Sequence, residues 1–145
     1  MEFPIHIPFV DYLGFELLRF EGGEAEMALT PRDDLLNSWS VLHGGVTMTL
    51  LDVVMAHAAR SPRPGVAADA RGVVTIEMKT SFMRPGLGRL QAHGKVLHRT
   101  VSFAFCEASI VDAENQLVAH ATGTFKYLAA LPAGGRKLNR LNASD

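Results

Sequence analysis

One stretch of this sequence restricts the fold more than any other. Residues 44–60 read GGVTMTLLDVVMAHAAR and have the length of a helix of about four turns. A surface helix normally has one polar face, but positions 46–59 are apolar or small on almost every side. The sequence therefore predicts a helix that is covered on most sides and ends before Pro62 and Pro64.

Segments with β-strand character supply that cover. They are a hairpin of residues 15–20 and 24–30, then strands at residues 72–84, 89–99, 101–111 and 117–128, with a short helical turn at residues 9–13. These segments predict an α+β fold, in which a curved antiparallel sheet of about five or six strands wraps one long central helix. We expect a single domain over residues 1–131 and a flexible tail over residues 132–145.

Residues 72–84 form the longest predicted strand. Simple alternation assigns its side chains to two faces, with Val74, Ile76, Met78 and Phe82 on one and Thr75, Glu77 and Lys79 on the other.

The composition excludes several classes of protein. The chain is 48% hydrophobic and 20% charged with a net charge of −1, so neither nucleic acid nor an anionic membrane is expected as a partner. The N-terminus lacks a basic region and the longest apolar run is too short to span a bilayer, which predicts a cytoplasmic protein. The single cysteine, Cys106, lies in a strand-like run and is expected to be a buried, unreactive thiol.

The six histidines do not have the spacing of a metal site. No H-x-H or H-x-x-x-H pattern occurs, and His43 and His57 would lie about 21 Å apart on a continuous helix. We predict no metal.

Asp52 is the anomaly in the apolar helix. A buried carboxylate is costly unless it is hydrogen-bonded, so Asp52 either faces a wet edge or an interface, or it serves a function. The start of the helix favours a function. At Gly44 and Gly45 the first helical N–H groups lack partners inside the helix and lie at the positive end of its dipole, a site for a developing oxyanion.

Geometry separates these two groups. Gly44 and Asp52 are eight residues apart, which is about 12 Å along a helix, so one reacting carbonyl cannot contact both. Two chains with antiparallel central helices would bring Gly44 of one to Asp52 of the other. The sequence therefore predicts a homodimer with two shared sites.

The same residues carry a family resemblance. Asn37-x5-His43-Gly44-Gly45-x6-Asp52, followed by residues 72–85 (GVVTIEMKTSFMRP), resembles the hotdog-fold acyl-CoA thioesterases of the phenylacetate-degradation type. The resemblance covers about residues 10–128. It implies hydrolysis of an acyl-CoA to a free acid and coenzyme A without a cofactor, by a dimer or a dimer of dimers.

The resemblance also implies roles for single residues. Gly44 would donate its N–H to the thioester oxygen, Asn37 would hold the surroundings of the nucleophile or the attacking water, and Asp52 of the partner chain would be nucleophile or general base. Thr75 would orient the water. His43 would fix the loop, and with Gly45 it would contact substrate.

Cationic side chains are expected to meet the phosphates of coenzyme A. The candidates are Arg84 and Arg99, with Arg89 and Lys126 as further possibilities. The acyl group is expected to be aryl or medium-chain, and Trp39, Met48, Phe82 and Phe103 either line its pocket or pack in the core.

Two other functions are compatible with such a fold. A hotdog hydratase or dehydratase would pair a histidine with an acid, for which the sequence offers no suitable local motif. A non-catalytic module that binds acyl-CoA would tolerate the loss of Asp52, whereas a hydrolase would not.

Overall fold

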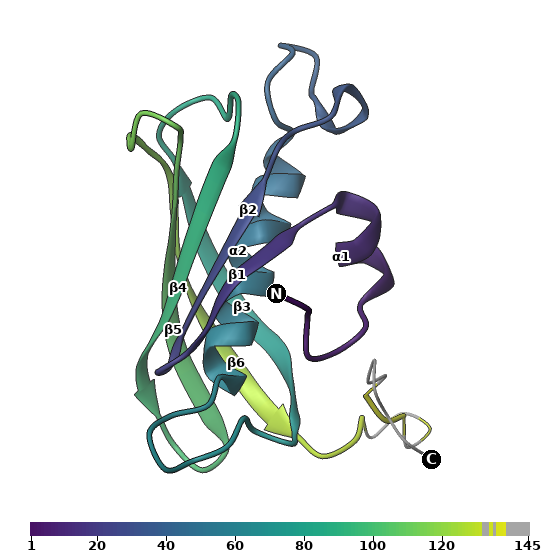
Figure 1. The fold of residues 1–145 in the computed structure, drawn as a ribbon, viewed down its shortest axis with the longest axis vertical. Coiled ribbons are helices and arrows are strands. Elements are labelled where there is room, and N and C mark those ends of the chain that lie inside the picture. Colours follow the sequence, from purple (N-terminus) through teal and green to yellow (C-terminus); the bar gives the residue numbers. More distant parts are fainter. Residues whose placement is uncertain (132–133, 135, 139–145) are drawn as a thin grey trace.

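A long helix lies across the inner face of a curved sheet (Figure 1), as the sequence predicts. The computed structural model describes residues 1–131, 134 and 136–138. The elements in chain order are α1 (Pro8–Leu13), β1 (Glu16–Glu21), β2 (Glu24–Leu29), the short 3₁₀ helix η1 (Asp33–Leu35), α2 (Gly44–Arg60), β3 (Gly72–Phe82), β4 (Leu90–Arg99), β5 (Phe103–Val111) and β6 (Leu117–Leu128).

The six strands form one antiparallel sheet in the order β1-β2-β4-β5-β6-β3. Strands β1 and β3 are the edges of this sheet. Side chains alternate along the central strands β4 to β6, where small or apolar residues such as Ala104, Cys106 and Ala108 point inward and are buried. The α+β prediction and the number of strands are confirmed.

The sheet packs closely against α2. Leu50, Leu51, Val54 and Met55 of the helix are fully buried. At Gly94 of β4 the two backbones come so close that an added Cβ atom would lie 2.8 Å from the Val54 carbonyl oxygen.

The N-terminal segment covers a second side of α2. It runs beside the helix on the side away from the sheet (Figure 1), and Val10 and Leu13 of α1 join the main hydrophobic core. A third side remains uncovered, since Gly45 and Met48 are exposed and Asp52 and Ala56 are only partly buried. These four residues recur every three or four positions, so they form one stripe along α2.

The predicted alternation in β3 is wrong at one point. A β-bulge shifts the register between Thr75 and Glu77, so Ile76 is the extra residue and is half exposed. Thr75 pairs with the buried Phe125 and points inward, toward α2, rather than sharing an outer face with Glu77.

Six predicted strand ends differ from the structure by one or two residues, and local contacts give the reason for three of them. Arg89 pairs with Glu16 by its side chain and precedes β4. Strand β5 begins at Phe103 because the Thr100 hydroxyl accepts the backbone N–H groups of Ser102 and Phe103 and forms a turn. Strand β3 ends at Phe82, since the next two N–H groups both donate to the carbonyl of Val118.

Much of the predicted tail lies outside the described residues, namely positions 132–133, 135 and 139–145. In the part that is described, the N–H of Leu131 donates to the Arg136 carbonyl, and the Leu138 side chain lies against Gly72 of β3. None of the helices in the described part of the chain is long and apolar enough to span a membrane.

The close approach at Gly94 predicts a specific sensitivity. Gly94→Ala should lower the free energy of unfolding by about 1–3 kcal/mol, because the new methyl group meets helix backbone that cannot move aside. Urea unfolding followed by circular dichroism measures this loss. Gly123→Ala is the matched control, since the atoms nearest to its methyl group belong to the side chains of Phe125 and Met55 rather than to backbone, and the thioether of Met55 can shift. Equal losses in the two variants would contradict the close packing of α2 on β4.

Candidate active site

Asp52 and Thr75 form a directly hydrogen-bonded pair. The Thr75 hydroxyl donates to Asp52 Oδ1 at 2.6 Å, from β3 to the uncovered stripe of α2. The bulge at Ile76 makes this contact possible, because it turns Thr75 toward the helix. The structure thus brings together two of the predicted site residues within one chain.

Burial and the hydroxyl act on Asp52 in opposite directions. Burial beside apolar residues raises the pKa of the Asp52 carboxyl above its ordinary value, and the hydrogen bond from Thr75 lowers it. The burial effect is the larger. Asp52 is therefore more basic than a surface aspartate, which suits a group that accepts a proton near neutral pH.

The start of α2 holds a second cluster. His43 is the N-cap, and its Nδ1 accepts the N–H of Gly45 at 2.8 Å, so this ring fixes the turn into the helix. In the described part of the chain, the N–H of Gly44 has no hydrogen-bond acceptor. The N–H of Gly44 thus remains available to an oxyanion at the positive end of the helix dipole.

Asn37 is occupied by its own loop. Its side-chain oxygen accepts the N–H groups of Trp39 and Val41, at 2.9 and 3.3 Å, which closes the loop before α2. Its side chain therefore supports the helix start from within the same chain. A contact with a catalytic water stays a prediction.

Within one chain, the Asp52–Thr75 pair lies far from the cluster at the start of α2. Helix α2 is continuous from Gly44 to Arg60, so Gly44 and Asp52 are about 12 Å apart along its axis. The ring of Phe82 lies beside Gly44, where an added Cβ would be 3.5 Å from it, and this side chain is more than half exposed.

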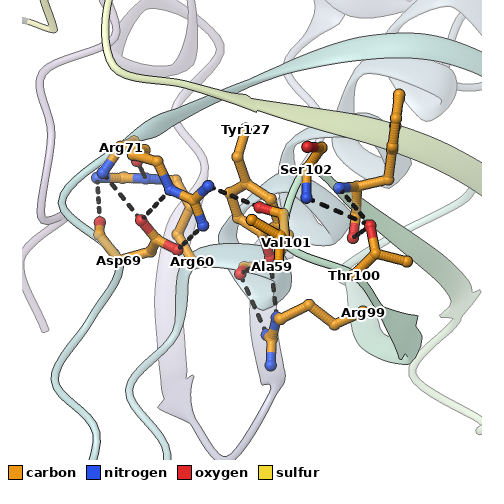
Figure 2. Close-up of polar contacts among 10 residues, drawn as sticks. Ala59, Arg60, Asp69, Arg71, Arg99, Thr100, Val101, Ser102 and Tyr127 are labelled. Carbon is orange, nitrogen blue, oxygen red and sulfur yellow. Dashed lines mark hydrogen bonds and ion pairs between the residues drawn. The ribbon is translucent and has the colours of Figure 1, made fainter.

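The two predicted coenzyme A arginines lie at opposite ends of α2. Arg84 is exposed near the helix start, where its Nη1 donates to the Leu117 carbonyl at 3.1 Å. Arg99 lies at the far end (Figure 2), where it donates to the Tyr127 hydroxyl and to the Ala59 carbonyl. Tyr127 in turn donates to the same carbonyl at 2.6 Å.

The contacts of Arg99 and Tyr127 supply hydrogen-bond donors to a carbonyl group in the last turn of α2. Cations and donors are favourable there because the last carbonyls lack partners and carry the negative end of the dipole. Arg71 completes the group, stacking over the Tyr127 ring and pairing with Asp69. Arg99 therefore has a role in capping α2, and its contact with coenzyme A stays a prediction.

A cavity of about 360 Å³ extends from Asp52 along α2. Its walls come from the N-terminal segment, from the first residues of β3, from Leu138 and from helix residues as far as Arg60. None of the four predicted pocket residues lines it, and Trp39 is 84% exposed. Sequence reasoning missed Ile5, Ile7 and Phe9 because nothing local indicates that the N-terminus folds back over the helix.

The cysteine prediction is confirmed. Cys106 is buried in β5, and burial raises the pKa of its thiol to about 12, which makes it unreactive. Among the described residues no group of three or more histidine, cysteine or acidic side chains could hold a metal ion.

A helix wrapped by one antiparallel sheet, with a glycine-bearing start and a carboxylate on its uncovered stripe, is the arrangement of a thioester hydrolase of the hotdog fold. Residues 40–119 match the thioesterase superfamily, and the chain belongs to this family. The match selects the hydrolase among the three functions that the sequence allows.

Individual relatives agree with this assignment. The medium/long-chain acyl-CoA thioesterase YigI of Escherichia coli is 29% identical over 135 residues, covering 85% of this chain and 87% of YigI. The solved structure of conserved protein PA5202 from Pseudomonas aeruginosa is 28% identical with a TM-score of 0.79, covering 86% of this chain and 97% of that one. The E. coli PaaI protein from the phenylacetic acid degradation operon is 24% identical with a TM-score of 0.75, covering 83% of each chain, and shares the fold.

The opposing effects on Asp52 predict the result of one substitution. Thr75→Val removes the hydrogen bond that lowers the pKa of Asp52, so this pKa should rise further. Titration of the Asp52 carboxyl by ¹³C NMR measures the change. Thr49→Val is the control, because Thr49 donates to the Gly45 carbonyl instead, and it should leave the pKa of Asp52 unchanged. A fall in the pKa of Asp52 in Thr75→Val would contradict the assigned hydrogen bond.

Proposed function

We propose that this protein hydrolyses acyl-CoA thioesters with aryl or medium-chain acyl groups, at sites shared between two chains. The observation that carries the proposal is the Asp52–Thr75 pair at the mouth of an apolar cavity. Membership of the thioesterase superfamily supports the reaction type, and the name of YigI supports acyl-CoA as substrate.

The uncovered stripe of α2 supports a dimer. Gly44 and Asp52 are placed symmetrically about Met48, which is exposed. If a two-fold axis passes near Met48, the two helices run antiparallel, and Gly44 of each chain faces Asp52 of the other. Exposed apolar side chains on the adjoining edge strand, Ile76 and Phe82, favour burial in the same interface.

The proposed reaction starts with water held between Asp52 and Thr75. The single hydroxyl proton of Thr75 is donated to Asp52, so its oxygen can accept a hydrogen bond from that water. Asp52 then takes a proton as the water oxygen attacks the thioester carbon. The raised pKa of Asp52 suits this general-base role.

The helix start of the other chain completes the reaction. The N–H of Gly44 donates to the oxyanion that forms. Because this N–H has no acceptor among the described residues of its own chain, no internal bond must break first. When the carbon–sulfur bond breaks, the sulfur of coenzyme A leaves as a thiolate and takes the proton that Asp52 accepted from the water, which restores the carboxylate. The products are a free acid and coenzyme A.

The cavity fits the acyl group. From Asp52 to Arg60 its helix wall measures about 12 Å along the axis, which suits a medium-length acyl chain. We expect Arg84, which is exposed near the helix start, to meet a phosphate of coenzyme A.

The proposal predicts that two substitutions strongly reduce turnover. Asp52→Asn should reduce kcat about 10²–10⁴-fold through loss of the base. Gly44→Pro should reduce it about 10²–10³-fold, because proline removes the N–H but is well tolerated at the first position of a helix. Release of free thiol from a panel of aryl and aliphatic acyl-CoAs measures both effects.

A matched control separates the lost N–H from altered shape. Gly44→Ala keeps the N–H, and its methyl group would meet the Phe82 ring at an ordinary 3.5 Å, so it should stay within about tenfold of the original activity. If Gly44→Pro is as active as Gly44→Ala, the helix start is not the oxyanion site.

Mixing the two inactive variants tests the shared site. After dissociation and reassociation, half of the dimers contain one chain of each kind, and one of their two sites is intact, so about a quarter of the original activity should return. Activity that stays absent after confirmed subunit exchange would contradict the shared site.

A further inference from the structure

The cavity beside Asp52 has a neighbour at the start of β3. This second cavity has a volume of about 130 Å³ and is lined by residues 72–74, 128–131 and 136–138. Its walls are apolar apart from Arg136 and Lys137, whose side chains are exposed. Among the described residues, three line both cavities, namely Gly72, Val73 and Leu138. These three residues therefore form the wall that the two cavities share.

Leu138 is the part of this wall that does not belong to the sheet. Its side chain lies directly against β3, since an added Cβ on Gly72 would be 3.0 Å from it. The absence of a side chain at Gly72 permits this close approach. The chain reaches this position after a β-bridge between Leu131 and Arg136, and Leu138 is partly buried there. The Leu138 side chain can therefore be shortened without a change in the strands.

The position of the shared wall sets a length for the acyl group. The Thr75 hydroxyl donates to Asp52, so the thioester carbon lies beside Thr75 in the proposed reaction. Leu138 lies against Gly72, three residues before Thr75 in regular register on β3, which is a distance of about 10 Å. An extended chain advances about 1.2 Å per bond, so an acyl chain reaches Leu138 after about eight bonds. This distance corresponds to about nine carbon atoms.

We propose that Leu138 limits the acyl group to about nine carbon atoms, because it separates the acyl cavity from the second cavity. This inference rests on the proposed function, since it places the acyl group in the cavity beside Asp52. A longer acyl chain must displace Leu138 from Gly72 or fold back within the first cavity. The second cavity, with Val74 and Leu131 in its wall, is apolar enough to take the end of a longer chain once Leu138 is shortened. Leu138 acts on specificity and takes no part in the proton transfer at Asp52.

The test compares acyl groups on either side of this limit. Octanoyl-CoA ends before Leu138, whereas dodecanoyl-CoA extends beyond it. Each methylene buried in apolar surroundings is worth about fourfold in kcat/KM, so without a limit the longer substrate would be favoured more than about a hundredfold. We expect a ratio of dodecanoyl to octanoyl kcat/KM of about one or below, measured below the concentrations at which these substrates form micelles. A ratio above about ten in the original protein would overturn the proposal.

A variant assigns the limit to Leu138. Leu138→Ala opens the shared wall, so the ratio of dodecanoyl to octanoyl kcat/KM should rise at least about tenfold. Turnover of octanoyl-CoA should stay within about threefold of the original value, because this substrate ends before Leu138. Leu131→Ala is the matched control, since it shortens the same type of side chain at a residue that lines the second cavity but not the first. It should leave the ratio unchanged.

Two outcomes with these variants would overturn the role of Leu138. One is an unchanged ratio in Leu138→Ala, or an equal change in Leu138→Ala and Leu131→Ala. The other is a loss of octanoyl turnover of more than about tenfold in Leu138→Ala, because Leu138 would then support the whole site rather than its far end.

A binding measurement separates this inference from the proposed function. The probes are thioether analogues of octanoyl-CoA and dodecanoyl-CoA, which cannot be hydrolysed, and calorimetry gives their Kd values. Leu138→Ala should bind the dodecanoyl analogue at least about tenfold more tightly than the original protein does, and the octanoyl analogue equally well. Equal affinities of both proteins for both analogues would overturn the inference. Absence of hydrolysis of every acyl-CoA, with the expected change in affinity present, would overturn the proposed function alone.

Discussion

The burial of α2 is the constraint on which the rest of this structure depends. A helix that is apolar on almost every side is unstable in water unless neighbouring segments cover it. The sheet covers one side of α2, with a glycine at the closest approach, and the N-terminal segment covers another. What remains is one stripe, and Asp52 lies on it.

That stripe explains how an apolar helix can contain a carboxylate. Asp52 is buried enough for its pKa to rise, yet it keeps a hydroxyl partner and an opening to the cavity. A fully buried aspartate would remain protonated, and a fully exposed one would be a weaker base. The same packing leaves Met48 exposed at the midpoint between Asp52 and Gly44. A partner chain that covers this apolar surface would also bring its own Gly44 to Asp52.

Local patterns in the sequence account for most of the fold. The helix at residues 44–60 was predictable because no other arrangement buries that run, and the strands were predictable because their side chains alternate. The inward position of Thr75 was not predictable from alternation, since a bulge at Ile76 reverses the faces of the strand. A bulge depends on pairing with a distant strand, in this fold β6, and leaves little local signal.

The candidate site, like the fold, was only partly predictable from local sequence patterns. Gly44 and Asp52 were identified by their spacing on one helix, whereas the cavity wall contains Ile5, Ile7 and Leu138, which come from both ends of the chain. Such long-range contacts follow from tertiary packing rather than from neighbouring residues.

The most direct test of the shared site is the specific activity of the protein on dilution, measured beside its mass by light scattering or sedimentation. If each site needs Gly44 of one chain and Asp52 of another, activity per chain should fall in parallel with the fraction of dimer and return on reconcentration. A monomer that keeps full activity would show that one chain suffices, and the shared site would be disproved.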